Sequence, residues 1–401
     1  MTEHTDVLVV GGSVGGLRTA ESLRRFGFSG RVTVLEDGGD LPYDRPALSK
    51  QLLAGAGGPE TVMLRRQADL DKAAIEFRLR TRAVALDSAA RRATLADGRS
   101  IGYTTLVIAT GTAARRLPAD VPGTHYLRTL RDALALRTAA AAASRAVIIG
   151  GGFIGSETAS VLAVAGLSVT VVEPFAFPLS RTLGDTVGAR LARMHESRGV
   201  RLVPGHAVTR VEKGDGTERA VVLDDGRVLS ADLVIAGIGA VPNTGWLDGS
   251  GIEVADGVVC DEFCRASVPG VYAVGDVARW FNPALGESMR VEHWTNAVEQ
   301  AAVVAANIAS PASPRSFSSV PYVWSDQYGS RLQVVGRPQP GDALVTVLDD
   351  AAAGSFAAIY VRGERVAGGY LENAPARAMP LRRAIAAGEL ARDVLAAVPA
   401  R

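Results

Sequence analysis

The stretch from Ala146 to Glu173 constrains the fold of this chain more than any other. A short β-branched run predicts a buried strand that ends in a tight glycine turn, and residues 156–166 are predicted to form the helix that follows. A second apolar strand then ends on Glu173. Between the first strand and the helix lies the G-x-G-x-x-G spacing of a dinucleotide-binding βαβ unit, made by Gly150, Gly152 and Gly155. The helix start favours phosphate binding, whereas a tight turn without a ligand is the alternative.

Glu173 also indicates which nicotinamide nucleotide is used. A carboxylate at the end of the second strand accepts hydrogen bonds from ribose hydroxyls and would repel a 2′-phosphate. Residues 174–177, Pro-Phe-Ala-Phe, contain no basic side chain. We therefore expect NADH as the nucleotide.

The same signature occurs at the start of the chain. A strand from Asp6 to Val10 is followed by Gly11, a helix to about Phe26, and a strand 31–36 that ends on an acid, Glu36. The middle glycine of the fingerprint is replaced by Ser13, whose hydroxyl can hydrogen-bond a phosphate. Two fingerprints predict two dinucleotides, a flavin and a nicotinamide; a degenerate nucleotide fold is the alternative for the first.

Composition excludes several other classes of protein. The 401 residues carry a net charge of +1, which indicates neither a nucleic-acid binder nor an acidic tail. Two cysteines cannot form a disulfide scaffold and favour a reducing compartment. No long apolar run predicts a membrane span, and a first strand that has begun by Asp6 leaves no room for a signal peptide. We expect a cytoplasmic protein, and the five histidines show no metal-ligand spacing.

Further segments resemble one family along nearly the whole chain. These are Y-D-R-P-A-L-S-K at 43–50, A-T-G at 109–111, L-R-T at 127–129, G-I-G-A-V-P-N at 237–243, G-D at 275–276, E-H-W-T-N-A at 292–297 and P-Y-V-W-S-D-Q at 321–327. In this order they resemble the oxygenase-coupled, NADH-dependent ferredoxin reductases, within the wider apoptosis-inducing-factor-like flavoproteins. The resemblance implies FAD and NADH as cofactors and a [2Fe-2S] ferredoxin as partner, with a P450 or Rieske oxygenase downstream.

Fingerprint and resemblance together give a set of candidate site residues. The FAD-binding candidates are Gly11, Ser13, Val14, Gly15, Gly16, Glu36, Arg45, Lys50, Val84, Ala109, Thr110, Gly111, Arg128, Gly275, Asp276, His293, Trp294 and Trp324. The NAD-binding candidates are Gly150, Gly152, Phe153, Ile154, Gly155, Glu157, Glu173, Arg181, Gly237 and Gly239.

Two of these candidates, Lys50 and Glu157, are hypothesised to act as a catalytic pair near the flavin and the nicotinamide. A solvated lysine, and a carboxylate that only complements the helix dipole, are the alternatives. For Trp324 the alternative to a place at the flavin edge is a place in the core.

The absence of cysteine from the segment after Glu36 restricts the redox chemistry that the chain can perform. Thiol-dependent relatives carry cysteines beside the flavin, but residues 37–56 contain none. Cys260 and Cys264 are predicted to be packed thiols, which disfavours disulfide-reductase chemistry. The last 25 residues are rich in arginine, and a basic face there would suit an acidic ferredoxin.

The predicted fold class is α/β, with two Rossmann-like domains of the glutathione-reductase type and a small α+β domain at the C-terminus. The predicted domains are an FAD domain of residues 1–112 and 241–315, an NAD domain of 113–240 and a C-terminal domain of 316–401. Within them we expect a strand at 77–87, a hairpin turn at Asp97-Gly98, helices at 131–143, 184–198, 295–309, 378–387 and 389–397, a strand–hairpin–strand passage at 200–235 and a Pro/Ser linker at 310–319.

The predicted function is transfer of a hydride from NADH to FAD and of single electrons to the ferredoxin, by a monomer or weak homodimer. A rubredoxin reductase, a reductase of small acceptors and a redox-sensing NADH-binding flavoprotein are the alternatives.

Overall fold

The computed structural model describes residues 3–118, 123–214, 216 and 218–396. The chain divides into two compact units, which we describe separately. Unit 1 comprises residues 1–44, 63–113 and 241–321, and unit 2 comprises residues 45–62, 114–240 and 322–401. The chain leaves unit 1 within β7 (Thr112–Ala114) and returns to it at β16 (Ala240–Pro242). The predicted domain boundaries themselves remain a prediction.

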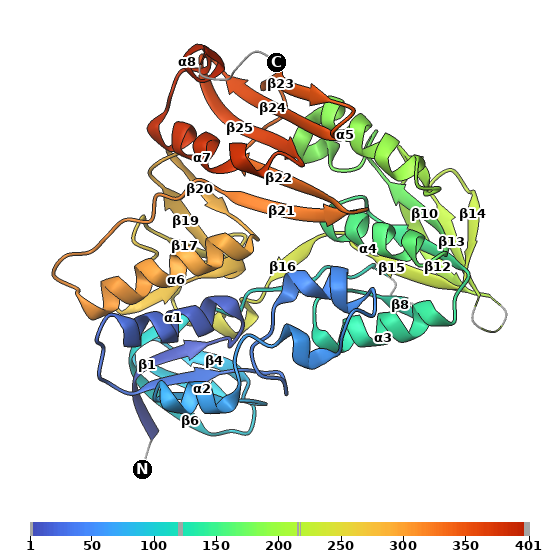
Figure 1. Ribbon diagram of the computed structural model, residues 1–401. Helices are drawn as coiled ribbons and strands as arrows, with labels where there is room; N and C mark the ends of the chain where they lie inside the picture. Colours follow the sequence, from blue (N-terminus) through green and yellow to red (C-terminus); the bar gives the residue numbers. More distant parts are fainter. Residues whose placement is uncertain (1–2, 119–122, 215, 217, 397–401) are drawn as a thin grey trace. The chain divides into compact units, whose positions relative to one another are not determined.

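Unit 1 is built on a seven-stranded sheet with the strand order β3-β2-β1-β6-β5-β4, in which β18 also pairs with β6. Its core strands are apolar and pair in parallel, so that β1, β2, β3, β6 and β18 all end at the same edge. Two helices, α1 (Val14–Arg25) and α6 (Trp294–Ala309), lie side by side (Figure 1). The strands are β1 (Glu3–Val10), β2 (Val32–Leu35), β3 (Ile75–Arg78), β4 (Ala83–Asp87), β5 (Arg92–Leu95), β6 (Ser100–Ile108) and β18 (Val271–Ala273).

The single strand predicted at 77–87 is wrong. This stretch supplies the end of β3 and all of β4, which lie at opposite edges of the sheet. After Arg78 the chain turns: Arg80 has a φ of 52°, and the amides of Arg80 and Thr81 donate to the carbonyls of Gly38 and Glu36, both at 2.8 Å. The turn is fixed by the end of β2, which the apolar pattern of 77–87 does not reveal. The hairpin turn at Asp97-Gly98 is confirmed between β5 and β6.

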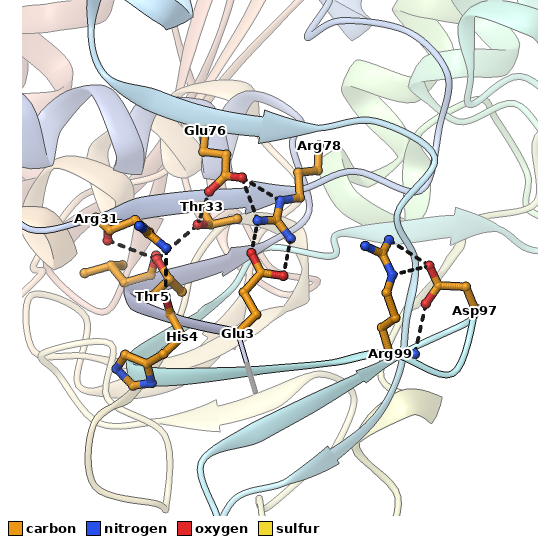
Figure 2. Close-up of polar contacts among 10 residues, drawn as sticks. Glu3, His4, Thr5, Arg31, Thr33, Glu76, Arg78, Asp97 and Arg99 are labelled. Carbon is orange, nitrogen blue, oxygen red and sulfur yellow. Dashed lines mark hydrogen bonds and ion pairs between the residues drawn. The ribbon is translucent and has the colours of Figure 1, made fainter. Parts of the chain in front are cut away.

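Polar side chains connect β1, β2 and β3 (Figure 2). Arg78 pairs with Glu76 at 2.6 Å and donates through Nη1 to Glu3 at 2.9 Å. The hydroxyl of Thr33 donates to Glu76 at 3.0 Å, and its oxygen lies 3.0 Å from the hydroxyl oxygen of Thr5. The hydrogen bond from Arg78 is the main reason why the pKa of Glu3 lies below its ordinary value.

The Pro/Ser segment predicted as a linker packs against unit 1. Phe317 is buried, and its carbonyl accepts a hydrogen bond of 3.2 Å from the indole nitrogen of Trp280. The amide of Arg315 donates to Asn307 of α6 at 2.7 Å. Trp280 belongs to a small sheet of β17 (Val258–Cys260), β19 (Ala278–Asn282) and β20 (Glu287–Arg290); unit 1 also contains α2 (Gln67–Lys72) and η5 (Gly275–Val277).

Both cysteines are free and buried in unit 1, as predicted. Burial raises the pKa of the Cys260 thiol to about 12 and raises that of the Cys264 thiol well above its ordinary value. Neither thiol is therefore ionised at neutral pH, so neither has the thiolate that disulfide chemistry requires.

Unit 2 contains a parallel sheet with the order β11-β10-β9-β15-β8. The region 200–235 is more elaborate than the predicted strand–hairpin–strand passage, because it forms five strands in two sheets. These strands are β11 (Arg201–Pro204), β12 (Val208–Lys213), β13 (Arg219–Leu223), β14 (Val228–Ala231) and β15 (Leu233–Ala236); the other strands of the parallel sheet are β8 (Thr124–His125), β9 (Arg145–Ile149) and β10 (Ser168–Glu173).

The helices of unit 2 confirm the predicted positions, with shifted ends. They are α3 (Leu130–Ala141), α4 (Phe153–Val164), which starts inside the glycine fingerprint, and α5 (Ser180–Glu196), which is interrupted at Gly184 with a φ of 74°. The 45–62 segment forms the short turns η1 (Arg45–Ala47), η2 (Leu48–Leu52) and η3 (Pro59–Val62).

The C-terminal part of unit 2 is the expected antiparallel sheet, drawn in orange and red in Figure 1. Its order is β21-β22-β25-β24-β23, and apolar side chains of α5, among them Leu183 and Leu191, pack with its buried residues Leu332 and Tyr370. The elements are β21 (Tyr322–Gln327), β22 (Ser330–Gly336), β23 (Ala343–Asp350), β24 (Ser355–Arg362), β25 (Arg365–Glu372), α7 (Ala378–Ala387) and α8 (Ala391–Ala396).

Candidate dinucleotide sites

In unit 1, the predicted FAD-binding segments meet at one edge of the sheet. Because β1, β2, β6 and β18 run in parallel, Gly11, Glu36, Ala109 and Gly275, which follow these strands, lie at their carboxyl ends. Backbone hydrogen bonds tie these ends together: the amide of Ala109 donates to Val10 at 2.8 Å and that of Gly11 to Leu35 at 2.8 Å. In α/β sheets, ligands bind outside this edge.

Close packing explains the glycines of the first fingerprint. A Cβ on Gly11, which has a φ of 108°, would overlap the carbonyl oxygen of Ala109, and a Cβ on Gly16 would overlap the carbonyl oxygen of Gly11. Gly15 faces Val274. The turn, the helix and the A-T-G strand end therefore come too close for any larger residue. Ser13 is the N-cap of α1, and its side chain makes no capping hydrogen bond, so its hydroxyl is available to a phosphate.

Glu36 is held in place by the backbone. One carboxylate oxygen accepts from the amide of Gly12 at 2.8 Å, and the other accepts from Gly38 at 2.9 Å. A carboxylate can accept about four hydrogen bonds, so acceptor positions remain for ribose hydroxyls.

The start of α6 contributes unsatisfied polar atoms. His293, the N-cap residue, is partly buried, and its Nδ1 is a buried atom without a hydrogen-bond partner. Burial lowers its pKa to about 4, against the opposing effect of Asp276, so the ring is neutral at neutral pH. Gln300 of α6 accepts a hydrogen bond of 2.7 Å from the amide of Gly275 and thereby fixes the Gly-Asp turn. Buried polar atoms without a partner are rare, and together with the glycine cradle and Glu36 they fit the polar groups of FAD.

Unit 2 repeats this arrangement at the carboxyl ends of β9, β10 and β15. The amide of Gly150 donates to Val172 and that of Gly237 to Ile149, both at 2.8 Å. A Cβ on Gly155 would overlap the carbonyl oxygen of Gly150, whereas nothing lies within 4 Å of a Cβ on Gly152. The space beside Gly152 leaves room for a pyrophosphate at the start of α4.

Glu173 completes the second nucleotide cradle, by which we mean the glycine loop 150–155 and the carboxyl ends of β9, β10 and β15. Its Oε2 accepts from Gly151 at 2.6 Å, and its Oε1 accepts from the amide of Phe175 at 3.1 Å. Gly239, with a φ of 106°, accepts from the amide of Arg115 at 2.9 Å. Beside the glycine loop, these residues fit a nicotinamide dinucleotide.

The structure brings Lys50 and Glu157 together. Glu157 lies in the first turns of α4, is only 3% exposed, and its Oε1 is 2.8 Å from the ammonium of Lys50 in η2. The same oxygen accepts from Ser325 of β21 at 2.7 Å, and the other oxygen accepts from Ser49. Lys50 also donates to the carbonyl of Pro46 at 3.1 Å. An ammonium has three N–H groups, so one remains for a ligand.

Other predicted residues occupy a range of positions. Trp324 of β21 is partly buried and stacks on Tyr322 with 6.2 Å between ring centroids, so it is not a core tryptophan. Val84 lies at a register shift between β4 and β5 and is exposed. Arg45, Lys50, Arg128 and Trp324 belong to unit 2, and their role in FAD binding remains a prediction.

Sequence reasoning missed four residues whose hydrogen bonds lead to Glu157 or Glu173. They are Ser49 and Ser325, which hold Glu157, Gln327, which donates to Ser325 at 3.1 Å, and Phe175, which follows the acid of β10. Three of them stood inside quoted motifs, but only the fold shows that these motifs meet.

Within the part of the chain that the structure describes, one group of side chains has the spacing of metal ligands, namely His206, Asp224 and Asp225. Asp224 accepts from Ala207 at 3.1 Å and Asp225 from Arg227 at 3.0 Å, so both carboxylates already serve as caps of backbone turns. None of the helices described has the length and apolar character needed to cross a membrane.

The fold and the two cradles define a protein that holds two dinucleotides. Residues 5–301 match the family model of the pyridine nucleotide-disulphide oxidoreductases, and residues 322–400 match that of the reductase C-terminal domain. The chain belongs to the pyridine nucleotide-disulphide oxidoreductase family. This family of FAD- and NAD(P)H-binding reductases confirms the predicted class of enzyme and both predicted cofactors.

Similar proteins refine this placement. The chain is 39% identical to a ferredoxin–NAD(P)(+) reductase of Sphingomonas, over 90% of this chain and 88% of that protein. It is 36% identical to the ferredoxin–NAD(+) reductase component of the anthranilate 1,2-dioxygenase system of Burkholderia cepacia, over 96% and 94%. A solved covalent complex of putidaredoxin reductase with putidaredoxin matches with a TM-score of 0.92 and 32% identity, over 98% of this chain and 95% of that chain. The predicted fold class and family resemblance are thereby confirmed.

Proposed function

We propose that this protein is an NADH-dependent reductase of a [2Fe-2S] ferredoxin that supplies a P450 or a Rieske-type oxygenase. One observation carries the proposal: a single chain holds two dinucleotide cradles. Both of its cysteines are buried free thiols, which disfavours a transfer of electrons through a thiolate. Relatives named as ferredoxin reductases, one of them a component of a dioxygenase system, support the choice of acceptor. A cytoplasmic location is part of the proposal, supported by the two free thiols.

When bound, FAD accepts a hydride from the reduced nicotinamide and releases electrons singly, which is the step size that a [2Fe-2S] cluster requires. The chain supplies binding and orientation. Glu36 and Glu173 present acceptors to the ribose hydroxyls of FAD and NADH, and the starts of α1 and α4 present amides to the phosphates. We assign Asp276, after β18, to a hydroxyl of the FAD ribityl chain.

Lys50 and Glu157 supply a fixed charge pair in unit 2. Glu157 is buried and bonded to Ser49, Ser325 and Lys50, so it keeps the ammonium of Lys50 at one position. The remaining N–H of Lys50 can donate to a bound cofactor. In this assignment the pair orients and stabilises the reacting groups, without transferring a proton.

Turnover with purified acceptors tests the function. We expect NADH to support rapid reduction of a [2Fe-2S] ferredoxin and slow reduction of a rubredoxin, measured by the absorbance change of each acceptor. Faster turnover with rubredoxin would favour a rubredoxin reductase. A long-lived reduced flavoprotein that is slow with both acceptors would favour a redox-sensing role.

A substitution tests the assignment of Lys50. Lys50→Ala removes the ammonium that Glu157 holds, so we expect flavin reduction by NADH to slow by about tenfold or more in stopped-flow measurements. Lys213→Ala, which removes an exposed lysine from β12 of the same unit, is the matched control and should reduce at the wild-type rate. Equal rates for all three proteins would remove Lys50 from the mechanism.

A further inference from the structure

Phe175 is an exposed aromatic residue on a fixed backbone. The residue is 43% exposed, although its side chain is apolar. Its amide donates to Glu173 at 3.1 Å, and its carbonyl accepts from the amide of Gly205 at 3.1 Å. Both backbone polar groups are thus engaged, and the ring is held out from the carboxyl end of β10. A rigid aromatic surface of this kind suits a ligand that covers it.

The loop that contains Phe175 is hydrogen-bonded to the glycine loop of the second cradle. Glu173 accepts from the amide of Gly151 at 2.6 Å, and the amide of Leu179 donates to the carbonyl of Gly151 at 3.1 Å. A Cβ on Gly151 would lie only 3.3 Å from Cα of Pro178. The segment 173–179 therefore forms one wall beside the predicted pyrophosphate position.

Arg181 adds a cation to this wall. It lies in the first turn of α5, and its Cζ is 5.8 Å from the centroid of the Phe175 ring. Its planar guanidinium can stack on an aromatic base as well as on Phe175.

We propose that Phe175, with Arg181 beside it, binds the adenine ring of NADH. The inference rests on the proposed use of NADH and adds the residues that recognise the base. Adenine is attached to the ribose whose hydroxyls we assign to Glu173, and Phe175 is bonded to that carboxylate through its own amide. Stacking on an aromatic ring recognises the flat face of a purine and needs no hydrogen bond from the side chain.

Binding of ADP-ribose, which carries the adenine but no nicotinamide, is the direct test. Isothermal titration of the FAD-loaded protein should show an affinity about tenfold lower for Phe175→Ala than for wild type, because a base–aromatic stack is removed. In kinetics, the ratio of kcat/KM for NADH to that for reduced nicotinamide mononucleotide, which lacks adenosine, should also fall about tenfold. Phe175→Leu, which keeps the apolar volume and removes the π-face, should lie between the two proteins and serves if the alanine variant fails to fold.

The chain offers a matched control in Phe26. The residue is 40% exposed, Cζ of Arg25 lies 5.1 Å from the centroid of its ring, and it belongs to unit 1. Phe26→Ala should bind ADP-ribose as wild type does. Wild-type affinity in both Phe175 variants, or an equal loss in Phe26→Ala, would overturn the proposal. Because ferredoxin reduction by the wild-type protein is measured separately, either outcome leaves the test of the proposed function intact.

Discussion

The buried carboxylate of Glu157 in unit 2 is stabilised by hydrogen bonds and an ion pair from individual side chains. A buried carboxylate is tolerated only where donors compensate for the loss of water. Ser325 can meet this need because Gln327 donates to its hydroxyl oxygen at 3.1 Å, which leaves the hydroxyl proton for Glu157. The direction of this short chain follows from the chemistry of its ends, since an amide nitrogen only donates and an ionised carboxylate only accepts.

Removing the hydroxyl of Ser325 should destabilise the protein. Ser325→Ala leaves Glu157 with one donor fewer in a buried site, and we expect the free energy of unfolding to fall by about 1–3 kcal/mol. Urea denaturation of the FAD-loaded protein measures this loss. Ser197→Ala removes an exposed hydroxyl that is bonded at 2.9 Å to the carbonyl of Met194, and it should change stability by less than about 0.5 kcal/mol. Equal losses in the two variants would contradict the role given to Ser325.

His195 gives a residue-scale prediction about pH. Its Nδ1 lies 2.7 Å from the hydroxyl of Tyr328, Arg198 lies 5.8 Å from the ring of Tyr328, and burial lowers the pKa of His195 to about 4 from 6.5. Between these two values the unfolded chain binds a proton that the folded chain does not, so stability falls as pH falls. The contribution is at most about 1.4 kcal/mol per pH unit and is complete above pH 6.5.

Denaturation at pH 7.5, 6 and 5 measures this dependence. His195→Gln retains a polar side chain that cannot titrate, and its stability should fall less steeply with acid than that of wild type. His206→Gln, in which the half-buried imidazole near Asp224 is replaced, serves as the control. The assignment fails if wild type and His195→Gln lose stability in parallel.

At the scale of elements, the contact of α1 with the end of β1 depends on the size of one residue. A Cβ on Gly16 would overlap the carbonyl oxygen of Gly11 and lie 3.1 Å from a methyl group of Val9. A backbone oxygen cannot rotate away as a side chain can, so Gly16→Ala must push α1 outward. We expect the free energy of unfolding to fall by about 1–3 kcal/mol and the purified protein to contain less FAD.

Thermal unfolding and the ratio of flavin to protein absorbance measure both effects of Gly16→Ala. Gly245→Ala is the control in the same unit, because nothing lies within 4 Å of its Cβ and its φ is not positive. Full flavin content in Gly16→Ala would show that α1 tolerates the shift.

The elements differ in how well the sequence predicts them. The helix Val14–Arg25 and the strands around it follow from local patterns, since glycines, an apolar run and a terminal acid all lie within one short segment. The break between β3 and β4 does not, because it depends on bonds from Arg80 and Thr81 to the end of β2. The hydrogen bonds of Glu157 are harder still to predict from the sequence, because Ser49 is 108 positions away from it and Ser325 is 168. Such contacts exist only once the chain has folded.

At the scale of the whole molecule, charge is distributed unevenly. The net charge is only +1, yet the described residues at the C-terminal end include Arg377, Arg382, Arg383 and Arg392 with few acids. On α7, Arg383 and the apolar Met379 are both exposed. An excess of arginines in one segment can attract an acidic partner at short range although the molecule as a whole is almost neutral.

Two variants with the same change in net charge separate a local from a global effect. Arg383→Glu reverses a charge on α7, and Arg25→Glu reverses an exposed charge at the end of α1 in unit 1. If the ferredoxin docks at the C-terminal arginines, Arg383→Glu should raise the KM for ferredoxin about tenfold at low ionic strength, whereas Arg25→Glu should leave it near the wild-type value. The difference should shrink in 0.5 M salt, where the screening length is only a few ångströms, and it should be absent when a neutral quinone is the acceptor. A similar rise in KM for both variants would mean that the ferredoxin responds to net charge and that its docking surface lies elsewhere.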